Sequence, residues 1–563
     1  MADNLEPGRR RSIKSMLLAG AACAAASGAI AGVSTRFSDD DAPLRFRSDY
    51  FGYAASVSPR AGYSTNINLA PDGFEEDAAT FSTLFSGSAI YSTPRFTGII
   101  GGDLDFSYIT EGSDFAVNQD IGATATLTVA DNLAYLDFSG STSRQLLGDN
   151  ARFSQNINAA RDQRADVHTF SVSPYLYREF SDTSSATLRY RYSQVFIGDD
   201  DAGANPFGND LLNDSRSHEV LAGYNTGRKF DRVRIALSAY GNNTVEDGSV
   251  IFPRFEYDQG TGTAEGQVAL TDSFGLSGAV GWDEIDIEGP VTFFDDDELS
   301  GFFWRAGFFA RPGRRTDIRI EYGERFDNGF IDANLNYRIS DRLTFNAGAS
   351  QSFESRAQYI TSAFIDSQRQ TLAFAEQLRT GEARSPRDVI ESANRFAGTS
   401  YHSQSGAVGV NESAFVGLNG VYDRTEFSLF GHYSDTDFGF RRNQYFTGGL
   451  NVRRELSRRL AGYAGVFVRG AETTLDQLTC QTSPFLFGFD VTQPLFDPVA
   501  ACLQYALNNG RTTTFGGRVG AAYRLYENLS VFGEFAHTQR VAADNALLEY
   551  GENAFFAGAT LEF

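Results

Sequence analysis

The sequence has 563 residues, a formal charge of −23 and 42% hydrophobic residues. An acidic chain of this kind lacks the basic surface on which polynucleotide binding depends, so no nucleic-acid partner is expected. After the first 35 residues, no apolar run approaches the ~18 residues that a membrane-spanning helix needs. Any membrane-spanning part must therefore consist of strands, which a closed barrel permits because each backbone group pairs with a neighbouring strand.

The amino-terminal segment has the features of an export signal. A basic region with Arg9 to Arg11 and Lys14 precedes a small-residue apolar stretch, and Ala29-Ile30-Ala31 provides an A-x-A cleavage site. We expect residues 1–31 to be removed as a signal peptide, which changes the formal charge from −23 to −25 because four basic and two acidic residues are lost. The paired arginines also match a twin-arginine signal. That route carries folded cargo, so the general secretory route is expected for a barrel.

Residues 32–49 form a short acidic and polar lead that contains Asp39-Asp40-Asp41. The lead is too short for a plug domain or for periplasmic assembly repeats. Its length therefore argues against a TonB-dependent receptor and against a secretion-type translocator. We expect this lead to lie in the periplasm and the barrel to begin soon after Tyr50.

From Tyr50 onward, extended segments alternate with two kinds of connection. One kind is long, acidic and rich in Gly and Asn, at residues 198–214, 242–252 and 288–298. The other kind is short, with Asp, Asn or Ser between apolar anchors, at residues 129–133, 270–274, 339–343, 456–460 and 526–529. Asp and Asn reverse a chain readily because their side chains cap their own backbone and tolerate left-handed angles. The repeating unit is therefore a hairpin.

This pattern predicts an all-β fold, a transmembrane antiparallel up-and-down β-barrel of about 22 strands, or roughly 18 to 24, over residues 50–563. Both termini are expected on the side of the short turns. A soluble β-sandwich would also alternate apolar and polar residues. The repetition of ~10-residue alternating segments over most of the chain favours the membrane barrel.

Charged residues occupy one face of several predicted strands, as in residues 316–322, where Ile and Tyr alternate with charged side chains. A charged side chain facing lipid at the midplane would cost about 2 to 4 kcal/mol, so these faces are expected to line the lumen. The predicted lumen-lining residues are Arg189, Arg191, Arg232, Arg234, Arg305, Asp317, Arg319 and Glu321. Two interpretations stay open. Either these arginines pair with Asp317, Glu321 and Asp332 and neutralise a wet interior, or they line an open path that favours anions.

The last strand carries the features of an assembly signal. Phe555, Leu561 and Phe563 share one face of an extended chain, and the sequence ends on an aromatic residue, as bacterial outer-membrane barrels commonly do. We therefore expect the barrel-assembly machinery to be a partner, and outer-membrane lipid and lipopolysaccharide to surround the barrel. An ordinary edge strand is the alternative.

Two segments break the hairpin rhythm. Residues 356–412 contain helical signals at 364–379, and Ser385-Pro386 provides a cap residue and a first-turn proline before 388–396. Short helices are therefore expected in this one long loop, which either folds into the pore or caps it. Residues 471–510 are apolar for a loop.

The loop at residues 471–510 also contains Cys480 and Cys502, the only cysteines left after removal of the signal peptide. In an oxidising compartment a disulfide between them is the expected state, and free thiols are the alternative.

Candidate sites for catalysis or metal binding are missing from the sequence. The five His residues have no metal-ligand spacing, and neither a nucleophile motif nor a phosphate loop is present. Residues 199–203 partly match a calcium loop, but the remaining ligands of such a loop are missing, so a solvated acidic loop is expected. We expect no enzyme activity, no cofactor and no metal.

Two stretches and the late loop with its helical insert carry a family resemblance. They are Val57-Ser-Pro-Arg-Ala-Gly-Tyr-Ser-Thr-Asn-Ile-Asn-Leu69 and Asn132-Leu-Ala-Tyr-Leu-Asp-Phe-Ser-Gly-Ser-Thr-Ser-Arg-Gln145. Over residues 50–563 the chain resembles the outer-membrane β-barrel family associated with PEP-CTERM (exosortase) and exopolysaccharide loci. The resemblance implies the outer membrane of a Gram-negative bacterium, assistance in export of polysaccharide, and polysaccharide-export proteins as partners. It transfers no binding residue.

Three functional hypotheses follow from the sequence. The first is a pore or export-associated channel for polysaccharide or another polar solute. The second is a structural, surface-displayed barrel with a blocked lumen. The third is a general porin. An outer-membrane hydrolase is disfavoured, because the sequence contains no catalytic constellation.

Overall fold

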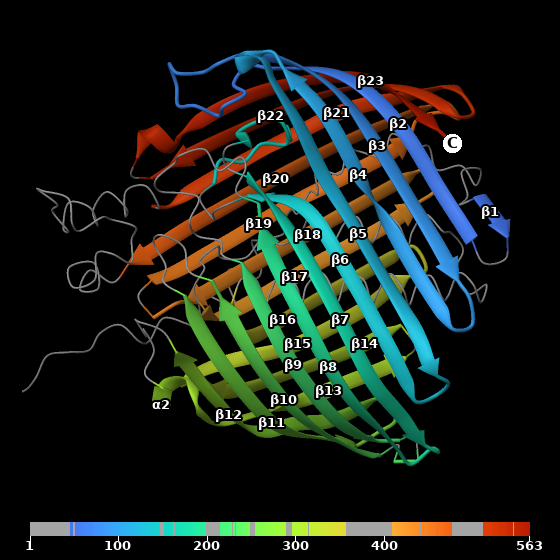
Figure 1. Ribbon diagram of the computed structural model, residues 1–563, viewed down its shortest axis with the longest axis vertical. Helices are drawn as coiled ribbons and strands as arrows, with labels where there is room; N and C mark the ends of the chain where they lie inside the picture. Colours follow the sequence, from blue (N-terminus) through green and yellow to red (C-terminus); the bar gives the residue numbers. More distant parts are fainter. Residues whose placement is uncertain are drawn as a thin grey trace, which may run out of the picture.

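The computed structural model describes residues 45–48, 51–146, 151–161, 164–198, 214–227, 229–230, 232–247, 254–288, 296–313, 315–355, 358, 408–439, 441–475, 510–543 and 545–563. Within them, one antiparallel sheet closes on itself into a barrel (Figure 1). The strand β2 (Phe51–Ser64) pairs with the last strand, β23 (Tyr550–Glu562), and the strands between them pair in chain order. The prediction of a closed, up-and-down barrel is confirmed, with 22 strands from β2 to β23.

The barrel strands contain between 10 and 17 residues. A tilted strand needs about 9 to 11 residues to cross a bilayer, so most of these strands are long enough to extend beyond it. Between β2 and β23 the strands are β3 (Ala78–Ser92), β4 (Phe96–Ile109), β5 (Asp114–Ala130), β6 (Ala134–Leu146), β7 (Arg164–Phe180), β8 (Ser184–Ile197), β9 (Ser215–Thr226), β10 (Val233–Glu246), β11 (Phe255–Ala269), β12 (Phe274–Glu288), β13 (Gly301–Gly313), β14 (Thr316–Arg325), β15 (Asn328–Ser340), β16 (Leu343–Ser355), β17 (Val408–Tyr422), β18 (Thr425–Asp437), β19 (Arg441–Glu455), β20 (Leu460–Leu475), β21 (Thr512–Tyr526) and β22 (Leu529–Ala542). In the connections that the structure describes, short helical turns include η1 (Glu111–Ser113), α2 (Asp296–Leu299) and η4 (Ala546–Leu548).

The five short connections predicted from the sequence are all tight turns between neighbouring strands. The turn between β5 and β6 passes through Asn132, whose φ of 59° is left-handed, as expected for an Asn at a chain reversal. The turn between β17 and β18 contains Asp423 in the same conformation, with a φ of 55°. These turns gather at one end of the barrel, which we call the short-turn end, and the opposite end is the long-loop end.

The long-loop end also contains connections as short as turns, which the sequence pattern did not predict. β14 and β15 are joined by Phe326 and Asp327 alone, and both residues have left-handed φ angles, 55° and 53°. A two-residue turn of this kind matches the right-handed twist of the strands that it joins. β4 and β5 are likewise joined by only a few residues.

The barrel is closed at a seam between β2 and β23. β23 pairs with β2 from Ser56 to Ser64. The short strand β1 (Arg45–Ser48), which lies within the predicted lead, pairs with Phe51, Gly52 and Tyr53 at the start of β2. At the end of β23, the backbone N–H of Phe563 donates to the carbonyl of Ala55 (2.9 Å). At the short-turn end of the seam, β2 therefore pairs with β1 beyond the point where its pairing with β23 ends.

Several predicted features lie outside the described residues: the signal peptide at 1–31, the helical signals at 364–379 and 388–396, and the cysteines Cys480 and Cys502. Three predicted loop boundaries need correction. Residues 242–246 belong to β10, residues 408–412 to β17 and residues 471–475 to β20, because each stretch completes a ladder with a neighbouring strand.

Among the residues that the structure describes, no helix is both long and apolar enough to cross a lipid bilayer.

Candidate functional site in the barrel interior

Side chains alternate between an outer and an inner face along each strand. The inner face is recognised by ion pairs between strands that are not neighbours, such as Arg189 on β8 with Asp137 on β6 (2.9 Å). Side chains converge on the concave side of a closed barrel, so contacts of this kind form there. The opposite face exposes large apolar side chains, including Leu188, Val220, Ile235, Val280, Trp282, Phe302, Val466 and Val519.

The apolar outer band ends near Trp282 on β12, where the alternation of residue types inverts. Beyond it Glu284 and Asp286 are exposed on the outer face, and Ile285 is buried on the inner face. Aromatic residues are typical of the membrane interface and charged residues of the region beyond it. A polar interior inside an apolar exterior is the arrangement of a barrel in lipid. The chain is an outer-membrane β-barrel of a Gram-negative bacterium. Its short-turn end faces the periplasm and its long-loop end the exterior.

A group of charged side chains on the inner face surrounds Arg305 on β13. Its guanidinium lies 3.0 Å from Glu265 on β11, 2.8 Å from Glu321 on β14 and 2.7 Å from Asp332 on β15. The side chain of Glu321 is 0% exposed, so its charge depends on this cation. Arg319 contacts two of the same carboxylates, those of Glu265 (3.4 Å) and Asp332 (3.3 Å). The two arginines and three carboxylates neutralise most of their charge locally.

A second set of paired charges lies on β8. Arg189 contacts Asp137 and stacks over the ring of Tyr175, with its guanidinium carbon 4.0 Å from the ring centroid. Arg191 contacts Glu219 on β9 (3.1 Å). Neutralisation by neighbouring carboxylates, one of the two interpretations from the sequence, therefore describes these arginines.

The remaining predicted lumen residues are less enclosed. Asp317 pairs with Arg311 at 3.0 Å, and both side chains are about half exposed; the sequence pattern did not single out Arg311. Arg234 on β10 is exposed and lines a cavity at the short-turn end. Arg232 is also exposed and immediately precedes β10. Arg232 and Arg234 make no ion pair within the described part of the chain.

At the long-loop end, two chain segments fold against the inner wall and meet the last strand. We call residues 64–70 and 151–161 the inward segments. Both reach Glu552 on β23, whose carboxylate accepts hydrogen bonds from Ser64 Oγ (2.6 Å), Asn156 Nδ2 (3.0 Å) and Ser154 Oγ. The side chain of Glu552 is almost fully buried, and the three donors compensate for the burial of its carboxylate.

The inward segments share the sequence pattern Ser-x-Asn-Ile-Asn-x-Ala, at residues 64–70 and 154–160. In each copy the serine hydroxyl accepts a hydrogen bond from the backbone N–H two residues later, at 3.2 Å in the first and 3.0 Å in the second. The copies also touch, because Ala160 N–H donates to the carbonyl of Ile67 (2.9 Å). This repeat is a signal from which the inward segments could have been predicted, whereas each copy alone resembles an ordinary polar loop.

Residues 151–161 extend across the interior from β6 to strands on the other side of the seam. The backbone of Phe153 exchanges two hydrogen bonds with the hydroxyl of Tyr550 on β23 (2.7 and 2.8 Å). Its ring packs edge-on against Phe467 of β20, with centroids 5.4 Å apart, and Arg469 lies over it. On β5, Asn118 donates to Asn158 (3.3 Å). The second inward segment therefore occupies part of the lumen.

A second group of contacts at the long-loop end joins strands that are not paired with each other in the sheet. Tyr257 on β11 is 0% exposed and packs edge-on against Phe353 of β16, with ring centroids 5.9 Å apart. Its hydroxyl donates to Gln358, which in turn donates to the hydroxyl of Tyr240 on β10 (3.0 Å). The buried cluster around them also contains Ile285, Leu299, Phe326, Val408 and Val410. The chain that follows β16 therefore begins by turning toward β10 and β11.

Within the described residues, no group of three or more His, Cys, Asp or Glu side chains is arranged to hold a metal ion. Charged groups of the interior such as Arg189 and Arg305 pair with carboxylates, and polar side chains around them form hydrogen bonds, whereas Arg232 and Arg234 make no ion pair among the described residues. This arrangement can hydrate and orient a polar solute.

No protein-family model matches the sequence, and no curated relative is found. Solved structures of similar shape include the ferric-catecholate import receptor Fiu from E. coli K12 (11% identity, 91% of this chain and 82% of that chain, TM-score 0.44). Another is the siderophore receptor PiuA from Acinetobacter baumannii (8% identity, 90% of this chain and 82% of that chain, TM-score 0.44). At these values the similarities assign no function to the chain.

Proposed function

We propose that this barrel is a pore or export-associated channel through which a polar solute crosses the outer membrane. The observation that carries the proposal is the polar inner wall. At separate positions around the barrel, strands carry ion-paired side chains on the inner face and apolar side chains on the outer face. Arg189 with Asp137 and Arg305 with Asp332 are two such ion pairs. A structural barrel needs no such wall, because an apolar core would hold it together as well.

The solute proposed is a polysaccharide, and this finer part rests on the family resemblance. Polysaccharide-export proteins would then be partners at the periplasmic end, and the barrel-assembly machinery and lipopolysaccharide partners in the membrane. Deletion of the gene in its own host should reduce polysaccharide at the cell surface, and the wild-type gene should restore it. Unchanged surface polysaccharide with reduced uptake of small solutes would instead support a general porin.

A structural barrel with a closed lumen is the second candidate, and the inward segments favour it. They bring buried residues such as Asn156 and Phe153 into the interior and fix them to the wall. If the lumen is closed, the charged inner wall lines no continuous path for a solute.

Conductance decides between the two candidates. Purified, folded protein in planar lipid bilayers should give discrete current steps, and proteoliposomes should swell in small sugars but not in large dextrans. Absence of current from protein shown to be folded by its heat-modifiable migration on gels would contradict the pore and support the closed barrel.

A further inference from the structure

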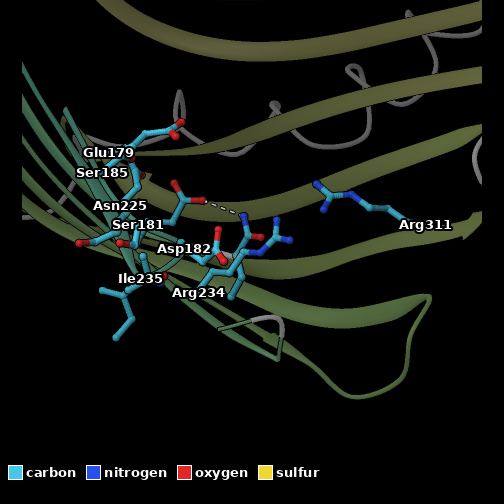
Figure 2. Close-up of a pocket in the computed structure, with 14 residues that line it drawn as sticks. Glu179, Ser181, Asp182, Ser185, Asn225, Arg234, Ile235 and Arg311 are labelled. Atoms are coloured by element: carbon cyan, nitrogen blue, oxygen red, sulfur yellow. Dashed lines mark hydrogen bonds between the residues drawn. The ribbon is translucent and has the colours of Figure 1, made fainter. Parts of the chain in front are cut away.

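A cavity of about 510 Å³ opens at the short-turn end of the barrel interior. Its lining comes from the turn between β7 and β8 and from the ends of β9, β10, β11 and β13. Figure 2 shows Asp182 and Arg234 in the middle of the group, Glu179 and Ser185 to one side of them, and Arg311 on the other side with its guanidinium directed toward them. The volume lies within the range of about 300 to 1,000 Å³ that is typical of small-molecule sites.

Most side chains that line the cavity can form hydrogen bonds, and few of them are apolar. Hydroxyls of Ser, Thr and the amides of Asn225 and Gln267 alternate with carboxylates and guanidinium groups. Many of these charged groups are already matched. Glu179 accepts from Tyr177 (2.8 Å), Glu265 accepts from Gln267 (3.1 Å), and Arg311 pairs with Asp317.

This composition decides the class of ligand. An anion would meet three carboxylates in the lining, and a cation would meet two guanidinium groups. An apolar ligand would leave these polar groups without water or partners. A neutral polyhydroxylated molecule fits best, because each of its hydroxyls can donate to a carboxylate and accept from an amide or a guanidinium.

Aromatic rings continue from the cavity along the wall of β7. Glu179, Tyr177 and Tyr175 are two residues apart, so their side chains lie on the same inner face at intervals of about 7 Å. The ring of Tyr175 stacks on Tyr135 of β6, with centroids 5.0 Å apart and an angle of 15°. Partly exposed tyrosine rings present a flat apolar surface with a polar tip, which suits the C–H face of a sugar ring.

We propose that this cavity binds neutral saccharide units and that Tyr177 supports the sugar next to it. The inference rests on the proposed function, since it gives the passing solute a site at the periplasmic end of its route. Gln267 and Asn225 would hydrogen-bond the sugar hydroxyls in the cavity, and Tyr177 would stack against the following ring.

Isothermal titration of folded protein in detergent with maltohexaose and with a dextran oligomer tests the site without requiring conduction. Wild-type protein should bind at least one of the two. The double variant Gln267→Ala/Asn225→Ala should bind about tenfold more weakly, because each lost hydrogen bond contributes a factor of about 2 to 12. Tyr177→Ala should weaken binding as well and provides a second test if the double variant does not fold.

Asn336→Ala is the matched control, because Asn336 lies on β15, outside the cavity, and contacts Asn334. Its affinity should equal that of the wild type. Failure of wild-type protein to bind either sugar, or equal affinity in the folded variants, would overturn the site. Current steps without sugar binding would reject the site and leave the pore, whereas sugar binding without current would reject the pore and keep the site.

Discussion

Asn156 and Glu552 are 396 residues apart in the sequence, and their side chains are joined by a buried hydrogen bond of 3.0 Å. The same carboxylate accepts from Ser64 at the end of β2 and from Ser154. Glu552 therefore connects both strands of the seam with residues 151–161. One buried side chain therefore links the seam of the barrel to the second inward segment.

Replacement of Glu552 by Ala should release residues 151–161 from the wall while the strands keep the barrel folded. Each buried donor left without an acceptor costs about 1 to 3 kcal/mol, and three donors lose their acceptor. We expect trypsin to cleave at Arg152 or Arg161 in the variant but not in the wild type, and single-channel conductance to increase. Glu552→Gln, which keeps one acceptor oxygen, should show a weaker effect.

Glu111→Gln, an exposed change in the short connection between β4 and β5, serves as a control and should leave cleavage and conductance unchanged. Equal resistance to trypsin in Glu552→Ala and wild type would show that the apolar contacts of Phe153 hold the segment without the carboxylate.

Arg305 and Arg311 provide a matched pair for testing the charge network. Arg305→Ala removes the cation beside fully buried Glu321 and should lower the free energy of unfolding by about 3 to 5 kcal/mol. Arg311→Ala breaks a half-exposed pair with Asp317 and should lower it by less than about 1 kcal/mol. Urea unfolding in lipid vesicles can be followed by the fluorescence of Trp282 and Trp304, the two tryptophans of the chain. Equal losses would mean that Glu321 draws little stabilisation from Arg305.

The barrel and its turns could be predicted because they depend on local patterns. Asn132 reverses the chain by its own conformation, and strand alternation separates Ile235 from Arg234 without knowledge of any partner. The choice of inner face for Arg189 and Arg305 followed from the cost of charge in lipid. Glu321 and Asp332 are among the carboxylates expected beside the arginines, and both pair with Arg305. The partner Glu265 could not be predicted, because register across two strands decides whether Arg305 meets it.

The inward segments could not be predicted from the same patterns. Residues 151–161 resemble a polar loop, and contacts from distant strands, such as Glu552 and Tyr550 on β23 and Phe467 on β20, make their burial favourable. The buried cluster around Tyr257 and Phe353 could not be predicted for a similar reason. It lies beyond the membrane, where the apolar face of the strands points inward. Contacts between distant segments determine both features.

Phe563 connects the seam with assembly of the barrel. Its side chain is 52% exposed on the outer face, and its N–H bonds to Ala55. Phe563→Asp should leave unfolded chain in the periplasm, detected as loss of heat-modifiable migration on gels. Phe74→Asp changes a more exposed phenylalanine, 71% exposed in the loop after β2, and should fold normally. Normal migration of the Phe563→Asp variant would reject the terminal strand as the assembly signal.

The disulfide expected between Cys480 and Cys502 lies outside the described residues and is testable in solution. A loop of about 20 residues closed by this bond would gain roughly 3 kcal/mol in the chain-entropy model. Thiol labelling of unreduced, denatured mature protein should be negligible, and the barrel should survive reduction because its strands hold it. Two labelled thiols per chain would contradict the bond.

Arg232 and Arg234, two exposed arginines at the start of β10, provide the simplest test of ion selectivity. Neither forms an ion pair within the described residues, so Arg232→Gln/Arg234→Gln removes two positive charges without leaving a buried carboxylate unpaired. The reversal potential in a KCl gradient should move toward cation preference, because a positive wall favours anions. Arg189→Gln/Arg191→Gln should shift it in the same direction and also destabilise the barrel, since Asp137 and Glu219 lose their partners.

Arg95→Gln is the control for both double variants, because Arg95 lies in an exposed turn beside Asp131 and outside the lumen. It should leave the reversal potential unchanged. Conductance with unaltered selectivity in both double variants would mean that these arginines do not line the limiting part of the path. The restriction would then lie at the long-loop end, where Phe153 and Asn156 enter the lumen.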